Sequence, residues 1–255
     1  IHGGDVSGGH DEAVRHAITK LSHIHFPVTE KSRERIIKLG EDPKRVFMVG
    51  APGLDSILNK RLMTREETLT KFGLAEPYLV VVQHPVPTEP EKAVGQFKET
   101  LKALDALKKQ TVMIYPNSDA GGRAIIGEIE EFKRPFVKTF KSLPHEDYLS
   151  LLKHAGALVG NSSSGIIETP SFHVPVVNIG IRQEGRERAN NVMDVGHDED
   201  EITAAIKKAL FDGGFKDVVK KCKNPYGEGK AGKRIADVLG KVEMGEGFIQ
   251  KRLAY

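Results

Sequence analysis

The chain has 255 residues, 39% of them hydrophobic and 29% charged, which is ordinary globular composition for one large or two modest domains. Its 38 basic and 35 acidic residues are mixed along the chain and give a net charge of +3, without the basic clusters that mark nucleic-acid partners. A single cysteine, Cys222, excludes an intrachain disulfide, and the absence of a long apolar stretch favours a soluble cytoplasmic protein with no membrane partner.

The first 55 residues alternate short apolar runs with amphipathic segments, the pattern of parallel strands joined by crossover helices. Ile1 and His2 resemble the end of a strand whose beginning is absent, which predicts a truncated first Rossmann-like domain over 1–55. Pro52 and Gly53 then break the rhythm, so that 56–76 is interpreted as a linker with a charged helix. Within 1–55, helices are expected over 11–22 and 30–40 and strands over 23–29 and 45–50.

The second set of elements is more complete and predicts a Rossmann-like domain over 77–238, followed by a C-terminal helix or tail over 239–255. Apolar runs typical of buried parallel strands lie at 78–85, 111–117, 136–140, 157–161 and 174–180. Helices are expected between them near 91–109, 122–132, 145–155 and 164–172, with further helices from 198 onward. The fold class is therefore predicted as α/β with two Rossmann-like domains.

Polar residues follow several of these runs, and in open α/β sheets a ligand binds at that carboxyl edge. The segment "GNSSSGIIE" places Ser162 and Ser163 at a helix start, where backbone N–H groups and the helix dipole favour a phosphate. Glu168, one turn after Ser164, is suited to accept hydrogen bonds from a ribose. The competing interpretation is an ordinary serine N-cap followed by a solvated glutamate.

Three further strand-end residues are candidates for the same site. His84, which Pro85 holds extended, can donate to a phosphate, and Arg182 can neutralise one. Asn117 follows the second strand of this domain. Taken singly, a surface histidine or a loop arginine often has no specific role. The prediction of a ligand site therefore depends on these residues lying together at the strand ends.

The opening segment "HGGDVSGGHDEAVR" gathers charged side chains on glycine-rich backbone. Asp5, Asp11 and Arg15, with His2, are candidates for acid/base chemistry, because neighbouring charge and burial shift such pKa values toward neutrality. Alternatively, Asp11 is simply an acidic residue favoured by a helix N-terminus. The histidines lack the spacing of a zinc site, so no metal is expected.

The chain resembles the UDP-N-acetylglucosamine 2-epimerase family, in its hydrolysing branch, which serves sialic acid and related nonulosonic acid pathways. The resemblance runs in order along the whole chain through "HGGDVSG", "RVFMVGAPGLD", "QHPV", "YPNSDAG", "GNSSSGIIE", "VNIGIRQEGRE" and "NPYGEGKAGKRI". It implies two Rossmann-like domains of the GT-B type with a UDP-sugar between them, and a homo-oligomer, either dimer or tetramer. It also implies elimination of UDP and addition of water to give N-acetylmannosamine, with no cofactor.

Carried over by position, the resemblance assigns the nucleotide to a set of six residues: His84, Asn117, Ser162, Ser163, Glu168 and Arg182. It assigns acid/base work to Asp11, with Arg15 one helical turn beyond it. Several relatives have glutamate at the position of His2, so the second acid/base group is either His2 or Asp5.

Three alternatives stay open from the sequence. The substrate is either UDP-N-acetylglucosamine or a UDP-2,4-diacetamido sugar. A non-hydrolysing epimerase is less favoured, because its "EAGLR" and "PEEANR" motifs are replaced by "HGGDV" and "DEAVR". A UDP-binding fragment without turnover is the third, because the family has a further segment ahead of Ile1.

Overall fold

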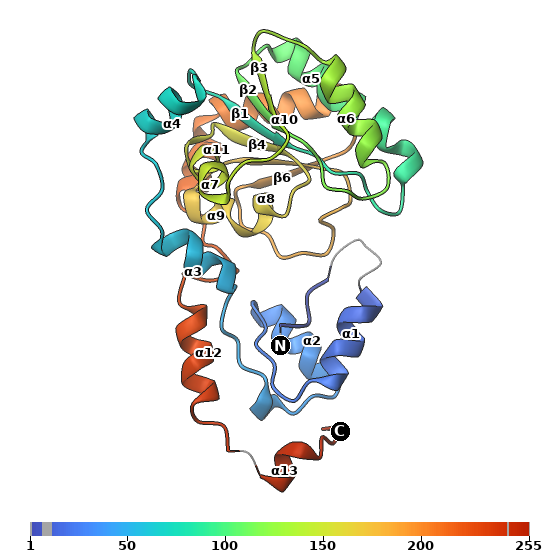
Figure 1. Cartoon of the computed structure of the whole chain (residues 1–255), viewed down its shortest axis with the longest axis vertical. Helices are drawn as coiled ribbons and strands as arrows, with labels where there is room; N and C mark the ends of the chain where they lie inside the picture. Colours follow the sequence, from blue (N-terminus) through green and yellow to red (C-terminus); the bar gives the residue numbers. More distant parts are fainter. Residues whose placement is uncertain (1, 7–11, 244, 255) are drawn as a thin grey trace. The chain divides into compact units, whose positions relative to one another are not determined.

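A computed structural model describes residues 2–6, 12–243 and 245–254 of the chain. By its internal contacts the chain divides into two units, residues 61–223 and residues 1–60 with 224–255 (Figure 1). Asp11, one of the predicted acid/base residues, lies outside the described residues. No helix in the described part of the chain has the length and apolarity needed to cross a membrane.

The larger unit contains a parallel sheet with strand order β3-β2-β1-β4-β5-β6. Its strands are β1 (Leu79–Val82), β2 (Thr111–Ile114), β3 (Val137–Phe140), β4 (Ala157–Gly160), β5 (Val176–Ile179) and β6 (Val192–Val195). The order reverses between β1 and β4, which is where open α/β sheets form their ligand crevice. The α/β class and five of the strands agree with the sequence prediction. The sequence analysis did not predict strand β6, whose sequence is VMDV.

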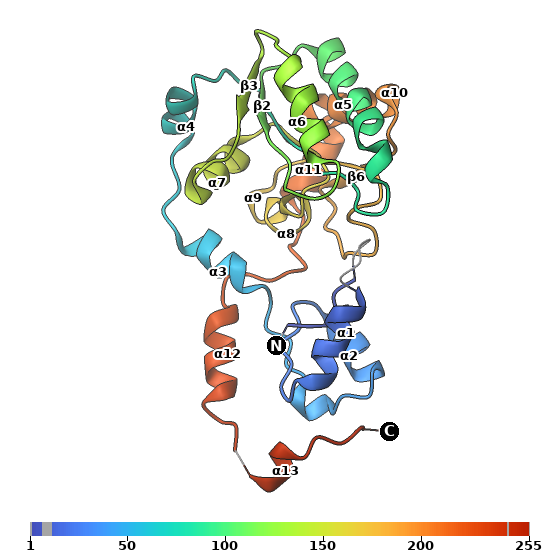
Figure 2. The same cartoon turned by 45° about the vertical axis from the view of Figure 1, so that its right-hand side comes forward.

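Both faces of the sheet are buried, which explains why its strands are almost continuously apolar. Leu79 and Val81 pack into a cluster with the helices α5, α6 and α10, whereas Val80 and Val82 pack on the other face with α4 and α7. Figures 1 and 2 show α5 and α6 on one side of the sheet and α7 and α8 on the other. The helices and 3-10 turn of this unit are α4 (Arg65–Phe72), η2 (Pro90–Lys92), α5 (Ala93–Leu107), α6 (Gly122–Glu131), α7 (His145–His154), α8 (Ser164–Ile167), α9 (Thr169–Phe172), α10 (Glu199–Phe211) and α11 (Gly213–Lys220).

Two glycines are required where β4 leads into the serine-rich loop. Gly160 has φ of +126°, and a Cβ there would lie 2.2 Å from the carbonyl oxygen of Val82. A Cβ on Gly165 would lie 2.9 Å from Cγ1 of Val176, so this glycine lets α8 pack closely on the sheet. The strand therefore ends in a sharp turn at the sheet edge.

The smaller unit contains α1 (Glu12–Leu21), α2 (Glu30–Lys38), η1 (Pro43–Arg45), α3 (Pro52–Asn59), α12 (Ala231–Leu239) and α13 (Glu246–Ile249). Residues around Pro52 form a helix, because proline at a first helical position has a suitable φ and no N–H to lose. The carboxylate of Asp55 on α3 accepts the backbone N–H groups of Ala231 and Gly232, at 2.9 and 2.6 Å, and so caps α12.

The strands expected over 23–29 and 45–50 were wrong as full strands, because only a parallel bridge between His25 and Val46 forms. Backbone hydrogen bonds join Phe47 N–H to His25 at 2.9 Å and Val49 N–H to Pro27 at 3.1 Å. Pro27 itself has no N–H to donate back, so the ladder cannot be completed beyond this point.

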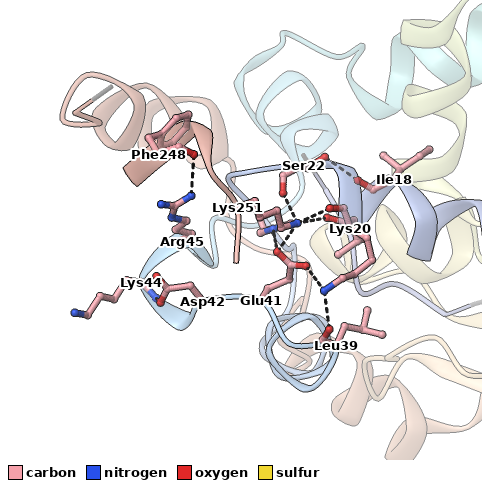
Figure 3. Close-up of polar contacts among 12 residues, drawn as sticks. Ile18, Lys20, Ser22, Leu39, Glu41, Asp42, Lys44, Arg45, Phe248 and Lys251 are labelled. Carbon is pink, nitrogen blue, oxygen red and sulfur yellow. Dashed lines mark hydrogen bonds and ion pairs between the residues drawn. The ribbon is translucent and has the colours of Figure 1, made fainter. Parts of the chain in front are cut away.

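A buried carboxylate, Glu41, joins three parts of the smaller unit (Figure 3). It lies 2.8 Å from Nζ of Lys20, 2.9 Å from Nε2 of His25 and 2.7 Å from Nζ of Lys251, and is only 2% exposed. The Lys251 ammonium also donates to backbone carbonyls at the end of α1, those of Thr19, Lys20 and Ser22. The C-terminal segment is thereby fixed to the helix that carries Arg15.

Burial alone would raise the pKa of Glu41, but hydrogen bonds from Lys20, Lys251 and His25 outweigh it and lower that pKa. Burial lowers the pKa of His25. Both shifts mean that the unfolded chain binds more protons than the folded chain in acid, so the free energy of unfolding falls as the pH drops below neutral.

We predict that Glu41→Gln lowers the free energy of unfolding of the smaller unit by about 3 kcal/mol, because it removes the buried carboxylate that pairs with two partly buried ammonium groups and with His25. Hydrogen exchange should report this as faster exchange in α1 and in residues 249–254. The pH dependence of protection should also become shallower in acid. The matched control is Glu30→Gln, an exposed i,i+3 partner of Arg33, with an expected change of about 0.5 kcal/mol or less. Equal effects of the two changes would contradict the role of Glu41.

Candidate functional site

His84 follows β1 and is held as a neutral imidazole. The backbone N–H of Asn117, which follows β2, donates to Nδ1 of His84 at 2.9 Å, so the neutral ring carries its proton on Nε2. Burial, aided by the cation of Arg182 and opposed by Asp119, lowers the pKa of His84 to about 4. At neutral pH, His84 is therefore a hydrogen-bond donor through Nε2 and carries no charge.

Asn161 follows β4 and connects three strand ends. Its side-chain Oδ1 accepts the backbone N–H of His84 at 2.7 Å, and its Nδ2 donates to the carbonyl of His84 at 2.8 Å. Its own carbonyl accepts hydrogen bonds from the side chains of Arg182 and Gln183, which follow β5, at 3.3 and 2.9 Å. Asn161 is completely buried.

Arg182 supplies positive charge at this edge. Burial lowers its pKa, but a guanidinium stays protonated at neutral pH. Nη2 of Arg182 lies 3.7 Å from the carboxylate of Asp119, which also accepts a hydrogen bond from Asn117 at 2.6 Å. Several buried atoms here have no hydrogen-bond partner among the described residues, namely Asn117 Oδ1, Arg182 Nε and Gln183 Oε1. Such atoms are expected where a polar ligand completes the hydrogen bonding.

The serine-rich loop after β4 differs from the single helix expected over 164–172. Two four-residue helices form, α8 and α9, and Pro170 at the start of α9 prevents a continuous helix. Ser162 Oγ accepts the N–H of Ser164 at 3.3 Å, whereas Ser163 occupies the N-cap position without a side-chain capping bond. A helix this short has little dipole, so the hydroxyl groups and Arg182 are the stronger candidates for holding a phosphate.

Glu168 lies one turn beyond Ser164, as expected, with its N–H donating to the Ser164 carbonyl at 3.0 Å. Burial raises the pKa of this carboxyl, opposed by the hydroxyl of Ser164. Its Oε2 is buried without a hydrogen-bond partner among the described residues. Tyr148 on α7 is close enough for the Glu168 carboxylate to contribute to the raised pKa of its phenol, behind the larger effect of burial. Glu168 thus retains capacity to accept hydrogen bonds from a ligand diol.

The remaining predicted residues belong to the smaller unit. Arg15 on α1 donates from Nη1 to the backbone carbonyl of Asp5 at 3.4 Å, so these two residues lie together. Asp5 and Arg15 are partly buried and His2 is exposed. Which carboxylate or imidazole acts as acid or base therefore stays a prediction.

Sequence reasoning gave no role to Asn161, Gln183 or Tyr148. Asn161 was visible as the first residue after a predicted strand, and Gln183 as the neighbour of Arg182. Tyr148 carried no comparable signal, because it lies on a helix and reaches the serine-rich loop only through tertiary packing.

Residues 1–240 match the family model described as UDP-N-acetylglucosamine 2-epimerase. The UDP-N,N'-diacetylbacillosamine 2-epimerase (hydrolyzing) of Legionella pneumophila is 39% identical over 258 residues, covering 100% of this chain and 67% of the relative. A UDP-N-acetylglucosamine 2-epimerase of Neisseria meningitidis is 36% identical over 216 residues, covering 84% of this chain and 57% of the relative.

The fold is also similar to a crystal structure of UDP-GlcNAc 2-epimerase from Neisseria meningitidis bound to UDP-GlcNAc. The TM-score is 0.78 at 18% sequence identity, over 92% of this chain and 66% of the other. The chain thus spans 57% to 67% of the length of these three proteins.

We predict that His84 stays neutral, with its proton on Nε2, down to about pH 5, in keeping with its pKa of about 4. Nitrogen-15 NMR of the imidazole measures both the tautomer and the titration. Arg182→Met should raise the pKa of His84, because it removes a neighbouring cation, but burial should still keep it below that of a free histidine. Arg134→Met, on the exposed surface, is the control. Titration of wild-type His84 near pH 6.5 would refute this description of the site.

Proposed function

This chain belongs to the UDP-N-acetylglucosamine 2-epimerase family, and we propose that it is a hydrolysing epimerase that converts UDP-N-acetylglucosamine to UDP and N-acetylmannosamine. The observation that carries the proposal is the edge of the sheet at which hydrogen bonds join the residues that follow β1, β4 and β5. There, a neutral histidine donor, an arginine cation and unpartnered buried polar atoms lie together.

Each group suits one part of a nucleoside diphosphate. Arg182 neutralises phosphate charge, while His84 and the hydroxyls of Ser162 and Ser163 donate to phosphate oxygens. Asn117 completes this surface on the β2 side. Glu168, with an unpartnered carboxylate oxygen, accepts from the two ribose hydroxyls.

In the proposed reaction, a base removes the C2 proton of the sugar while the C1–O bond breaks and its electron pair leaves with UDP. The donors around the diphosphate lower the barrier by stabilising the charge that develops on the leaving group. Water then adds its oxygen to C1 of the glycal, and C2 takes a proton on the opposite face. We assign the acid/base steps to Asp11 together with His2 or Asp5, and charge stabilisation beside them to Arg15.

A UDP-2,4-diacetamido sugar is the second candidate substrate. It is favoured by the identity of 39% to a relative named for UDP-N,N'-diacetylbacillosamine, against 36% to one named for UDP-N-acetylglucosamine. Both candidates share the UDP group and the 2-acetamido carbon, so the nucleotide site serves either.

The proposal includes a GT-B arrangement in which the UDP-binding Rossmann-like domain, expected over 77–238, has its sheet and packed helices within the unit of residues 61–223. Assembly as a dimer or tetramer is part of it, and light scattering after size-exclusion chromatography tests this.

The product test follows each UDP-sugar by NMR in deuterated water. We expect free N-acetylmannosamine with deuterium at C2, together with UDP, from UDP-N-acetylglucosamine. Faster turnover of the UDP-2,4-diacetamido sugar would identify it, rather than UDP-N-acetylglucosamine, as the substrate. Formation of UDP-N-acetylmannosamine would indicate the non-hydrolysing reaction, and UDP binding without turnover of either sugar would indicate a binding protein.

Replacing Ser162 and Ser163 together by alanine should weaken UDP binding by about tenfold or more, because two hydroxyl donors to charged oxygens are lost. Isothermal titration calorimetry measures the dissociation constant. Ser142→Ala, an exposed serine ahead of α7, should change it by less than about twofold. An unchanged affinity in the double variant would count against phosphate contact by these serines.

A further inference from the structure

The hydrogen bonds of Asn161 carry an inference that goes beyond the residues assigned above. We propose that Asn161 is a positioning residue, which fixes His84 as an Nε2 donor and keeps Arg182 beside it. This inference rests on the proposed function only for the identity of the ligand, a nucleoside diphosphate. The hydrogen bonds themselves are a property of the unliganded chain.

The side chain of Asn161 replaces backbone pairing where the sheet can no longer supply it. Val82 pairs with Gly160 as the last register position between β1 and β4, and Asn161 N–H donates to the Val82 carbonyl at 3.1 Å. The left-handed turn at Gly160 then ends the strand. Beyond it, the Asn161 amide bonds both the N–H and the C=O of His84, as a neighbouring strand would do.

Only a primary amide meets this requirement at this length. It offers one acceptor and one donor in a fixed plane, matching the donor and acceptor of one residue's backbone. A carboxylate would set an acceptor against the His84 carbonyl, and an aliphatic side chain would leave both groups of His84 unpaired. Because Asn161 is fully buried, water cannot substitute for the lost bonds without entering the protein.

The orientation of the His84 ring follows from its backbone. With the N–H and C=O of His84 held, the ring reaches the N–H of Asn117 through Nδ1 at 2.9 Å. That contact leaves the proton on Nε2, as a donor to phosphate requires. If the backbone loosens, the ring loses both its fixed tautomer and its dry surroundings.

The same residue is linked to the loop that carries Arg182. Gln183 Nε2 donates to the backbone carbonyl of Asn161 at 2.9 Å. The Arg188 guanidinium in turn donates to the backbone carbonyl of Gln183 at 2.7 Å. Arg188 pairs with Asp194 on β6. A continuous set of polar contacts therefore runs from the end of β1 to β6, with Asn161 between them.

The test compares Asn161→Ala and the smaller polar change Asn161→Ser with Asn191→Ala. Asn191 is an equally buried amide that donates to Thr169 Oγ1 at 3.0 Å and to the Val174 carbonyl at 2.8 Å. Those partners are a helix residue and the segment leading into β5, not strand-end residues of the site. Its loss therefore removes a similar number of hydrogen bonds without touching His84.

We expect Asn161→Ala to weaken UDP binding about 30-fold, as the loss of two buried hydrogen bonds implies, and Asn161→Ser to have a smaller effect in the same direction. Nitrogen-15 NMR without ligand should show His84 titrating well above its wild-type pKa of about 4, with both tautomers present. Asn191→Ala should lower the melting temperature comparably while leaving the His84 signals and UDP affinity within about threefold.

Unchanged His84 signals in a folded Asn161 variant would overturn the inference, as would UDP affinity indistinguishable from that of Asn191→Ala. If the alanine variant does not fold, the serine variant is judged by the same two measurements. Failure of the wild-type protein to bind UDP would instead refute the proposed function, and the ligand-free His84 spectra would still decide the role of Asn161.

Discussion

Two hydrogen bonds between the amide of Asn161 and the backbone of His84 close the sheet at the point where its strand order reverses. At such a point the connections that follow the two adjacent strands lead to opposite faces of the sheet, which opens a crevice beyond the strand ends but also leaves backbone groups there without strand partners. Here the buried side chain of Asn161 forms hydrogen bonds with the backbone N–H and C=O of His84. The polar residues that follow β2 and β5 then have a fixed structure on which to gather, and the candidate nucleotide site depends on it.

Burial gives this edge its electrostatic character. It keeps His84 uncharged, lowers the pKa of Arg182 and raises that of Glu168. The site thus combines an arginine cation that has Asp119 3.7 Å away, a neutral donor and a carboxyl that accepts hydrogen bonds. A diphosphate adds negative charge beside Arg182, and a ribose supplies donors for Glu168. These are preorganised interactions, which cost little rearrangement when the ligand binds.

The sequence predicted those features that depend on local patterns. Buried strands such as β1 and β4 are continuous apolar runs, so their ends, and with them His84 and Asn161, could be located from the sequence. Elements that contain a proline were predicted too long. Pro27 limits pairing to a single bridge, and Pro170 divides an expected helix into α8 and α9.

Roles at the site were equally hard to foresee where they depend on tertiary contacts. The neutral state of His84 results from burial and from its contact with Asn117, 33 residues away. The positioning role that we infer for Asn161 depends on contacts 77 and 22 residues away in the sequence. Chain order shows that these residues share an edge, but not which atoms face each other.

The most direct measurement is a crystal structure of the protein with UDP. The account predicts the diphosphate within hydrogen-bond distance of His84 Nε2 and the Ser162 and Ser163 hydroxyls, near the Arg182 guanidinium, with the ribose hydroxyls on Glu168. It also predicts that the Asn161 contacts to His84 persist in the complex. UDP bound elsewhere, or bound with His84 turned away from the phosphates, would contradict it.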